Sequence, residues 1–292
     1  MIVSNLMGGL GNQMFQFSCG RALSLRFEQE FYVAQDLFQK YPLHNGYELQ
    51  DAFDLKTKIV SKKNLKDLLG WQAPTLMRKF LGRRKMDWAV NKNWINEPQH
   101  SYWNGINHLN FPIYLHGYWQ SEKYFNDITD IIRNDFSFAT TLSDLDLEVL
   151  EKIKIHTAVS VHVRRGDYTI GKNTKVFAQT DIEYYHRAIN FLSRKNSNLK
   201  FFIFSDDPDW VKQNLIIDSE LIEIVSHNLG KNSANDMRLM SNCEHHIISN
   251  SSFSWWGAWL NPSSRKIVIA PKKWFLNDTD AVDIVPSKWL MM

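Results

Sequence analysis

Two adjacent arginines, Arg164 and Arg165, directly follow an apolar run that predicts a buried strand over 158–163. Planar guanidinium groups donate paired, charge-assisted hydrogen bonds, so two of them at one strand end suit a phosphate or a carboxylate. Ser251 and Ser252 open a later predicted helix, where hydroxyl and backbone N–H groups offer an anion site. Together these groups predict a clamp for a diphosphate. The alternatives are salt bridges of the arginines with nearby acids and simple helix capping by the serines.

The elements that must position these groups form a regular alternation from about residue 156. Apolar strands are predicted at 158–163, 199–204, 222–225, 246–248 and 267–270, and helices at 181–195, 208–215, 235–243 and 253–260. Such a pattern is typical of a buried parallel sheet, whose ligands bind outside the carboxyl ends of the strands. The residues that follow the first four strands are polar: Arg164, Arg165 and Asp167; Ser205, Asp206 and Asp207; Ser226, His227 and Asn228; and Ser249, Asn250, Ser251 and Ser252.

The N-terminal part offers a second strand end, since a strand at 2–7 is followed by Gly8-Gly-Leu-Gly11 and a predicted helix. The spacing departs from G-x-G-x-x-G, and no acidic residue stands at the expected distance, so a dinucleotide site is disfavoured. A tight glycine turn that brings Asn12 to a ligand fits better. Further strands are predicted at 31–34 and 113–119, the latter followed by a helix that begins at Ser121.

A metal site is not expected. Asp207 and Asp209 are the only D-x-D pair after an apolar strand, but both also suit the first turn of the helix that Pro208 begins. His245 and His246 are neighbours on a strand and point to opposite faces. The sequence contains no H-E-x-x-H, cysteine cluster or G-x-S-x-G motif.

The composition of the 292 residues, 44% hydrophobic and 22% charged, is that of a folded globular protein with room for two domains. A net charge of +3 is too small for a dedicated nucleic-acid binder. No apolar run is long enough to span a membrane, no secretory signal is recognisable, and the two cysteines suit a reducing compartment. We therefore expect a cytoplasmic protein.

Basic residues are concentrated between Lys56 and Lys92, where eleven Lys or Arg stand against two Asp. Within this stretch, 76–86 is predicted to form a short basic amphipathic helix. One interpretation is a solvated helix on an insert. The others are contact with an anionic membrane surface, which would make the protein peripheral on the inner face of the membrane, and a patch for an anionic acceptor.

Aromatic residues make up 13% of the chain. Trp255, Trp256 and Trp259 recur at helical spacing, which predicts burial in a core. Tyr118, Trp119 and the region 94–103 are better candidates for stacking on a sugar.

The segment His162-Val-Arg-Arg-Gly-Asp-Tyr168 resembles the H-x-R-R-G-D-Y motif of the inverting α-1,2-fucosyltransferases, glycosyltransferase family 11. Other segments agree with this family in kind and order. They are Gly8–Gln16, His116–Phe125, Phe204–Asp207, Asn235–Ser241 and Ser249–Leu260, whereas residues 56–105 match no motif of the family.

The resemblance implies an α/β, GT-B-like fold of two Rossmann-like halves whose parallel sheets face a cleft. Residues 1–155, with a basic, Trp-rich insert at about 56–105, would form the acceptor side, and 156–292 would bind GDP-L-fucose. The implied reaction passes fucose from GDP-β-L-fucose to the 2-hydroxyl of a galactose, with inversion and without a metal. The acceptor would be a β-galactoside oligosaccharide or a lipid-linked repeat unit.

The resemblance also implies roles for single residues. Arg164 and Arg165 would hold the donor diphosphate, Asp236 the guanine, and Asn12 would lie near the reacting sugar. Ser251 and Ser252 would lie on the phosphate side of the donor. The remaining candidates follow by position: Ser205, Asp206 and Asn250 for the donor, His162 for catalysis, and His116, Tyr118 and Trp119 for the acceptor.

Inversion requires the acceptor hydroxyl to lose a proton, and Asp167 is the first candidate for the general base. It could instead orient an arginine, because a late proton transfer to the departing phosphate needs no strong base. Competing interpretations of the chain are an α-1,6- or protein O-fucosyltransferase and a Trp-rich carbohydrate-binding module. The module is disfavoured because neutral sugars do not require two adjacent cations.

Overall fold

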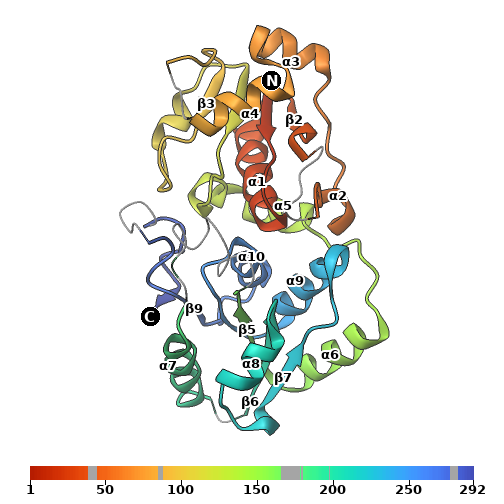
Figure 1. The fold of residues 1–292 in the computed structure, drawn as a ribbon, viewed down its shortest axis with the longest axis vertical. Coiled ribbons are helices and arrows are strands. Elements are labelled where there is room, and N and C mark those ends of the chain that lie inside the picture. The colour runs from red at the N-terminus through yellow and green to blue at the C-terminus, as the bar shows by residue number, and fades with distance from the viewer. Residues whose placement is uncertain (39–44, 85–87, 166–177, 179, 197, 277–281) are drawn as a thin grey trace. The chain divides into compact units, whose positions relative to one another are not determined.

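The chain divides into two compact units in the computed structural model, which describes residues 1–38, 45–84, 88–165, 178, 180–196, 198–276 and 282–292 (Figure 1). The first unit comprises Met1–Ala139 and Val282–Ile284, and the second Thr140–Ala281 and Val285–Met292. The sequence placed the boundary at 155/156, but α6 (Asp144–Ile155) belongs to the second unit. The reason is that its buried Val149 and Ile153 pack into that unit's core.

The first unit contains a four-stranded parallel sheet in the order β2-β1-β4-β3. Its strands are β1 (Ile2–Asn5), β2 (Phe31–Ala34), β3 (Trp94–Asn96) and β4 (Ile113–His116). Its helices are α1 (Leu10–Arg26), α2 (Leu49–Ala52), α3 (Lys62–Leu69), α4 (Thr75–Arg84) and α5 (Thr129–Asp135).

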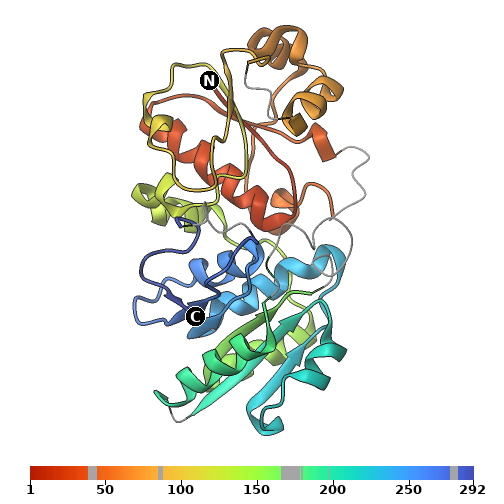
Figure 2. The same cartoon turned by 60° about the vertical axis from the view of Figure 1, so that its left-hand side comes forward.

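Two apolar clusters hold this unit together. α1 packs along β1 and β2 (Figure 2), with Phe17 in ring contact with Phe31 and Phe136. α3 and α4 supply leucines to a second cluster around Val3, Trp94 and Tyr114. The helix expected from Ser121 is broken into short 3₁₀ turns before α5 begins.

The second unit contains a six-stranded parallel sheet in the order β10-β9-β8-β5-β6-β7. Its strands are β5 (Thr157–Val163), β6 (Leu199–Ser205), β7 (Ile222–Val225), β8 (His245–Ile247), β9 (Val268–Ala270) and β10 (Leu290–Met291). The helices besides α6 are α7 (Ile182–Ser193), α8 (Pro208–Asn214), α9 (Ser233–Asn242) and α10 (Ser252–Leu260). The predicted parallel α/β pattern is confirmed within a few residues at the ends of the predicted elements, whereas β10 was not predicted.

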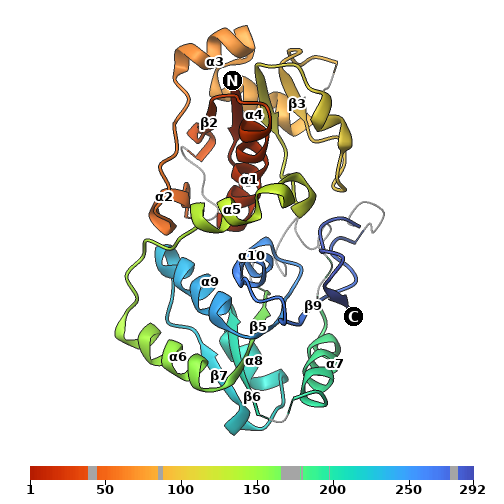
Figure 3. The ribbon, with the colours of Figure 1, turned by 180° about the vertical axis from the view of Figure 1, so that it is seen from behind.

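The helices of this unit are fixed by capping and by buried aromatic side chains. Asp181 caps α7 by accepting the backbone N–H of Tyr184, and α9 lies between α6 and α10 (Figures 1 and 3). Trp255, Trp256 and Trp259 are almost fully buried, which confirms their predicted place in the core. Among the described residues, no helix combines the length and the apolar character needed to cross a bilayer.

Candidate functional site

In the second unit, β6 and β7 continue the sheet on one side of β5, and β8 and β9 continue it on the other side. β5 and β8 are therefore neighbours in the sheet although β6 and β7 lie between them in the chain, and the strand order reverses at this point. Ligands of open α/β sheets bind at such a switch point, outside the strand ends. Arg164 and Arg165 follow β5 there, and Ser251 and Ser252 come soon after β8. The structure therefore brings both halves of the predicted diphosphate clamp to one edge of one sheet.

His162 joins these two strands. Its Nδ1 shares a hydrogen bond of 2.9 Å with Ser249 Oγ, and the ring is buried beside Phe253. Burial, together with the nearby charge of Arg164, lowers the pKa of His162 to about 3. A neutral, buried imidazole fits a structural role, in which it connects β5 to the residues after β8 by a hydrogen bond. This geometry gives no support to the predicted catalytic role of His162.

Each of the two arginines is paired with an aspartate at the end of β6. Arg164 Nη1 lies 3.1 Å from Asp206 Oδ2, and the backbone N–H of Arg165 donates to Asp206 Oδ1 at 2.9 Å. Arg165 Nε lies 3.4 Å from Asp207 Oδ2, and its guanidinium stacks 4.0 Å from the centre of the Trp210 ring. The salt bridges considered as an alternative thus exist. Both side chains remain 29% exposed, so a ligand can still reach them.

Asp207 and Asp209 serve α8, as the helix-capping interpretation expected. Asp207 Oδ1 accepts the backbone N–H of Trp210 at 3.1 Å, and Asp209 pairs with Lys212. Ser205 Oγ accepts the backbone N–H of Asp207 at 3.0 Å. Among the residues described by the structure, no three His, Cys, Asp or Glu side chains are grouped as metal ligands.

The N-terminus of α10 differs from a simply capped helix. Ser251 is the N-cap residue in extended conformation, but its side chain makes no capping hydrogen bond. Ser252 begins the helix and is half-buried. Capping therefore does not account for Ser251, and the interpretation of both serines as anion contacts stays a prediction.

Asn250 has a structural part in this loop. Its buried Nδ2 donates to the carbonyl groups of Ala178 at 2.7 Å and Trp274 at 2.9 Å, while Oδ1 accepts the Thr180 hydroxyl at 3.2 Å. The side chain was predicted to contact the donor. Its amide joins the segments at 178–180 and Trp274 to the loop, and contact with the donor stays a prediction.

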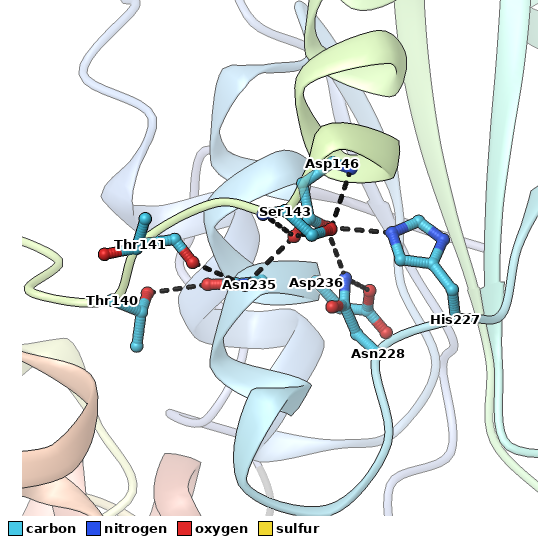
Figure 4. Close-up of polar contacts among 8 residues, drawn as sticks. All are labelled: Thr140, Thr141, Ser143, Asp146, His227, Asn228, Asn235 and Asp236. Carbon is cyan, nitrogen blue, oxygen red and sulfur yellow. Dashed lines mark hydrogen bonds and ion pairs between the residues drawn. The ribbon is translucent and has the colours of Figure 1, made fainter.

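A buried polar network surrounds Asp146, in the first turn of α6 (Figure 4). Its Oδ1 accepts Asn228 Nδ2 at 2.7 Å and lies 2.9 Å from His227 Nε2. Its Oδ2 accepts Asn235 Nδ2 at 3.1 Å and the backbone N–H of Ser143 at 2.9 Å. Burial opposes ionisation, but the hydrogen bonds from Asn228, Ser143 and His227 lower the pKa of Asp146 to about 2. This carboxylate therefore connects three parts of the unit, namely α6, α9 and the loop that follows β7.

Asp236, on α9, lies at the edge of this network. Its Oδ1 accepts Asn228 Nδ2 at 2.9 Å. Burial raises the pKa of Asp236 to about 7, and the Asp146 charge adds to that effect. A carboxyl group with a pKa near neutrality, bonded to a strand-end loop through Asn228, is a candidate for ligand contact. Asp236 was predicted from the sequence, but Asp146 was not, because its Ser-x-x-Asp spacing indicates only a capped helix.

In the first unit, Gly8 and Asn12 lie at the end of β1. Gly8 has φ +79°, a left-handed conformation suited to glycine, and a Cβ atom there would lie 2.6 Å from Asn12 Nδ2. Asn12 Oδ1 accepts Gln120 Nε2 at 2.7 Å. The predicted tight glycine turn is confirmed, and contact of Asn12 with a ligand stays a prediction.

The two glutamines that follow in α1 fix the neighbouring loops. Gln13 Nε2 donates to the carbonyl groups of Gly8 at 3.0 Å and Gly46 at 2.8 Å. Gln16 Nε2 donates to the carbonyl group of Gly117 at 3.1 Å. Much of the Gly8–Gln16 segment thus has an architectural function.

The three acceptor candidates differ in accessibility. Tyr118 is 37% exposed, whereas Trp119 is 1% exposed, with its edge against Tyr124. Glu97 holds both residues by accepting their backbone N–H groups at 2.7 and 2.8 Å. The prediction that Trp119 stacks on a sugar is wrong, because its ring is buried in the core against Tyr124. Sequence reasoning missed Glu97, for which spacing gives no signal.

His116 ends β4 and packs against Trp94 at 5.2 Å between ring centres. Its Nδ1 lies 3.1 Å from Asn5 Nδ2. Burial lowers the pKa of His116 to about 4, so the ring is neutral near pH 7. This environment is that of a packed side chain more than of an open sugar site. Asp167, the predicted general base, lies outside the described residues.

The chain is similar over most of its length to known glycosyltransferases. The model of the family described as glycosyl transferase family 11 matches residues 82–291. The α-1,2-colitosyltransferase of Escherichia coli is 32% identical, over 99% of this chain and 98% of its own length. The O-antigen biosynthesis glycosyltransferase WbnK of Escherichia coli is 29% identical, over 98% and 99%.

A solved structure of the α-1,6-fucosyltransferase NodZ, co-crystallised with GDP, superposes with a TM-score of 0.51. It is 13% identical and covers 89% of this chain and 92% of its own. This likeness concerns the fold, which is GT-B-like with a Rossmann-like parallel sheet in each half.

Proposed function

The chain belongs to glycosyl transferase family 11, and from this premise we propose that it transfers L-fucose from GDP-β-L-fucose to the 2-hydroxyl of a galactose, with inversion. The α-1,2 linkage is supported by the relative that is 32% identical over nearly the whole chain. The acceptor is a β-galactoside in an oligosaccharide or a lipid-linked repeat unit, as the O-antigen relative suggests.

The observation that carries the donor assignment is the pair of partly exposed guanidiniums at the end of β5. Asp206 and Asp207 hold Arg164 and Arg165 from one side, which restricts their rotamers before a ligand arrives. Such preorganised donors stabilise the charge that grows on a departing diphosphate. Ser251 and Ser252, at the N-terminus of α10, supply hydroxyl and backbone N–H groups for the same anion.

We assign the guanine to Asp236. A carboxylate accepts two hydrogen bonds from the N1–H and N2–H of guanine, a pattern that adenine and the pyrimidines do not present. Asn228 already donates to Oδ1, and Asp146 in turn fixes Asn228. The network in Figure 4 would thus hold the base-reading carboxylate in one orientation.

The proposed reaction breaks the bond between the fucosyl carbon and the β-phosphate oxygen while the galactose 2-hydroxyl oxygen forms its bond from the opposite face. The hydroxyl proton passes to a base, for which Asp167 remains the first candidate, or late to the departing phosphate. The neutral, enclosed imidazole of His162 is not assigned this step.

A second donor is supported by one specific observation, the 32% identity with an α-1,2-colitosyltransferase. Colitose is related to fucose, so the same diphosphate and guanine contacts would serve either donor. We retain GDP-colitose as the second candidate.

The test is a transfer assay with GDP-fucose and GDP-colitose, each supplied with an array of β-galactosides, followed by linkage analysis of the product. An α-1,2-fucosylated galactoside is expected. Preferred use of GDP-colitose would replace GDP-fucose as the assigned donor. An α-1,6-linked or peptide-linked product would replace the assigned α-1,2 linkage. Absence of saturable GDP binding by calorimetry would favour the carbohydrate-binding module.

A further inference from the structure

Four large apolar side chains of the first unit are exposed within one short stretch of the chain. Trp71 is 65% exposed, Leu76 81%, Phe80 45% and Trp88 84%. Large apolar side chains that gather on a surface mark an interaction site, whereas scattered ones need no explanation. We call these four residues the apolar patch.

The helix geometry of α4 separates an outer from an inner face. Leu76 and Phe80 are four residues apart and therefore share one face of the helix. The inner face holds Leu81, which is 3% exposed, and Arg78, which is 1% exposed and pairs with Asp36 and Tyr114. Exposure of Leu76 and Phe80 is thus not a consequence of a loosely packed helix.

Gln72 joins the backbone beside Trp71 to the backbone beside Trp88. Its Nε2 donates to the carbonyl of Ala89 at 2.6 Å, and its Oε1 accepts the backbone N–H of Asn91 at 2.7 Å. The two tryptophans therefore stand next to the same hydrogen-bonded junction, and Trp71 lies a few residues before α4.

The chain segment that carries the patch is basic. Lys62, Lys63 and Lys66 are exposed on α3, whose leucines share a buried cluster with α4. Leaving buried Arg78 aside, residues 61–92 contain eight Lys or Arg against two Asp, although the whole chain has a net charge of only +3. Exposed Trp, Leu and Phe side chains beside lysines are the combination that binds the interface of an anionic bilayer.

α4 also lies close to the strand ends of its unit. Its Thr75 and Arg78 contact Asp36, just after β2, and its Gly82 lies against the His116 ring at the end of β4. α4 therefore packs beside the strand ends of β2 and β4, and its outer face points away from these contacts.

We infer that the apolar patch and the lysines of α3 form a docking surface for an anionic lipid membrane. The apolar side chains enter the boundary between headgroups and acyl chains, and the lysines bind the lipid phosphates. No transmembrane segment is required for such contact, since an interfacial helix inserts only its apolar side.

The test is co-sedimentation of the full chain with vesicles, without sugar donor or acceptor, so that its outcome is independent of the proposed transfer. Binding to vesicles of phosphatidylglycerol and phosphatidylcholine is expected, with weaker binding to phosphatidylcholine alone and at high salt. The double variant Leu76→Ser, Phe80→Ser and the triple variant Lys62→Glu, Lys63→Glu, Lys66→Glu should each reduce binding at least about tenfold.

Ile216→Ser is the matched control, because Ile216 is 81% exposed on the second unit, and it should bind as the unchanged protein does. Thermal melting verifies that the variants are folded. The inference is overturned if the protein does not sediment with anionic vesicles, if Ile216→Ser weakens binding equally, or if phosphatidylcholine alone binds as well. Concentration-dependent self-association that Leu76→Ser, Phe80→Ser abolishes, without vesicle binding, would instead make the patch an interface between copies.

Discussion

Single carboxylates in this protein fix the positions of the groups that are assigned to the ligand. Asp206 and Asp207 do so for two arginines, and Asp146 does so for Asn228 and thereby for Asp236. An ion pair with 29% exposure adds little to stability, because solvent screens it. Its value lies in holding a guanidinium in one geometry, and this can be tested by conservative substitutions.

Arg165→Lys should preserve the fold and reduce kcat by at least ~10²-fold. The negative charge on the β-phosphate grows as the glycosidic bond breaks, so a contact there strengthens toward the transition state. Lysine keeps the charge but loses the planar fork and the stacking on Trp210. Steady-state kinetics, GDP titration and thermal melting together check this expectation.

Arg265→Lys, at an exposed position of the second unit, is the control and should behave as the unchanged protein does. If Arg165→Lys melts at a lower temperature in parallel with its loss of turnover, the ion pair with Asp207 is mainly structural. Near-normal turnover would leave the phosphate to Arg164 alone.

Asp236→Asn should raise the donor KM by at least ~10-fold and change kcat little, since a guanine contact is made equally in the ground and transition states. The pKa of Asp236 is raised to about 7, so its carboxylate fraction increases as the pH rises through 7. The donor KM of the unchanged protein should therefore fall over that range. The variant should lose this dependence, whereas exposed Asp209→Asn should keep it. A donor KM that is indifferent to both pH and Asp236→Asn would remove Asp236 from the base-binding site.

At the scale of elements, apolar runs predicted the sheet of the second unit because its central strands are buried and show no strict alternation of polar and apolar residues. β5 and β6 are of this kind, and helices of ordinary length separate the later strands. β3 (Trp94–Asn96) was missed because three residues with an asparagine give no periodic signal. The basic helix was predicted at 76–86 and the structure describes α4 as Thr75–Arg84, but no pattern indicated that Arg78 turns inward to Asp36.

The same limit applies to the candidate site. Arg164, Arg165, Ser251 and Ser252 could be predicted, because each lies within a few residues of the end of a strand that the sequence itself indicates. The function of Asn250 could not be predicted, since its partners, such as Trp274, are distant in sequence. Contacts of this type depend on tertiary packing and leave no local pattern.

The contact between α6, α9 and the loop after β7 depends on Asp146, and Asp146→Asn should destabilise the protein by about 3 kcal/mol. The new amide would place a donor against the N–H groups that now bind Oδ2. We expect a decrease in Tm of roughly 6–12 °C by calorimetry. Asp144→Asn, exposed on the same helix, should stay within about 1 °C. Equal melting of both variants would contradict the importance of the network.

The pH dependence of this effect has a definite sign. Because the pKa of Asp146 is lowered from 3.8 to about 2 on folding, its ionised form contributes stability above pH 3.8, and this contribution is lost as the pH falls to about 2. The difference in unfolding free energy between the unchanged protein and Asp146→Asn should therefore shrink in that window. A difference that grows on acidification would mean that the protonated carboxyl is the one that the fold selects.

At the scale of the whole molecule, basic residues occur in two separate places and serve two different functions. The first unit concentrates them around the apolar patch, and the second presents Arg164 and Arg165 at a sheet edge beside two aspartates. A transferase must neutralise the diphosphate that leaves the sugar, and a divalent cation or fixed protein cations can supply that charge. The two guanidiniums and the N-terminus of α10 are groups of the type that can supply this positive charge without a divalent cation.

We therefore expect the reaction to proceed without a metal ion, with rates that survive excess EDTA. The aspartates that could otherwise bind a cation have other partners, since Asp207 caps α8 and pairs with Arg165, and Asp209 pairs with Lys212. A cation there would have to displace three existing contacts. The measurement is initial rate against EDTA concentration, with GDP-fucose and acceptor held constant and with the chelator's calcium complex as the ionic-strength control. Loss of activity that Mn²⁺ restores, and that Asp209→Asn weakens further, would assign the leaving-group charge to a bound cation and reduce the arginines to its supports.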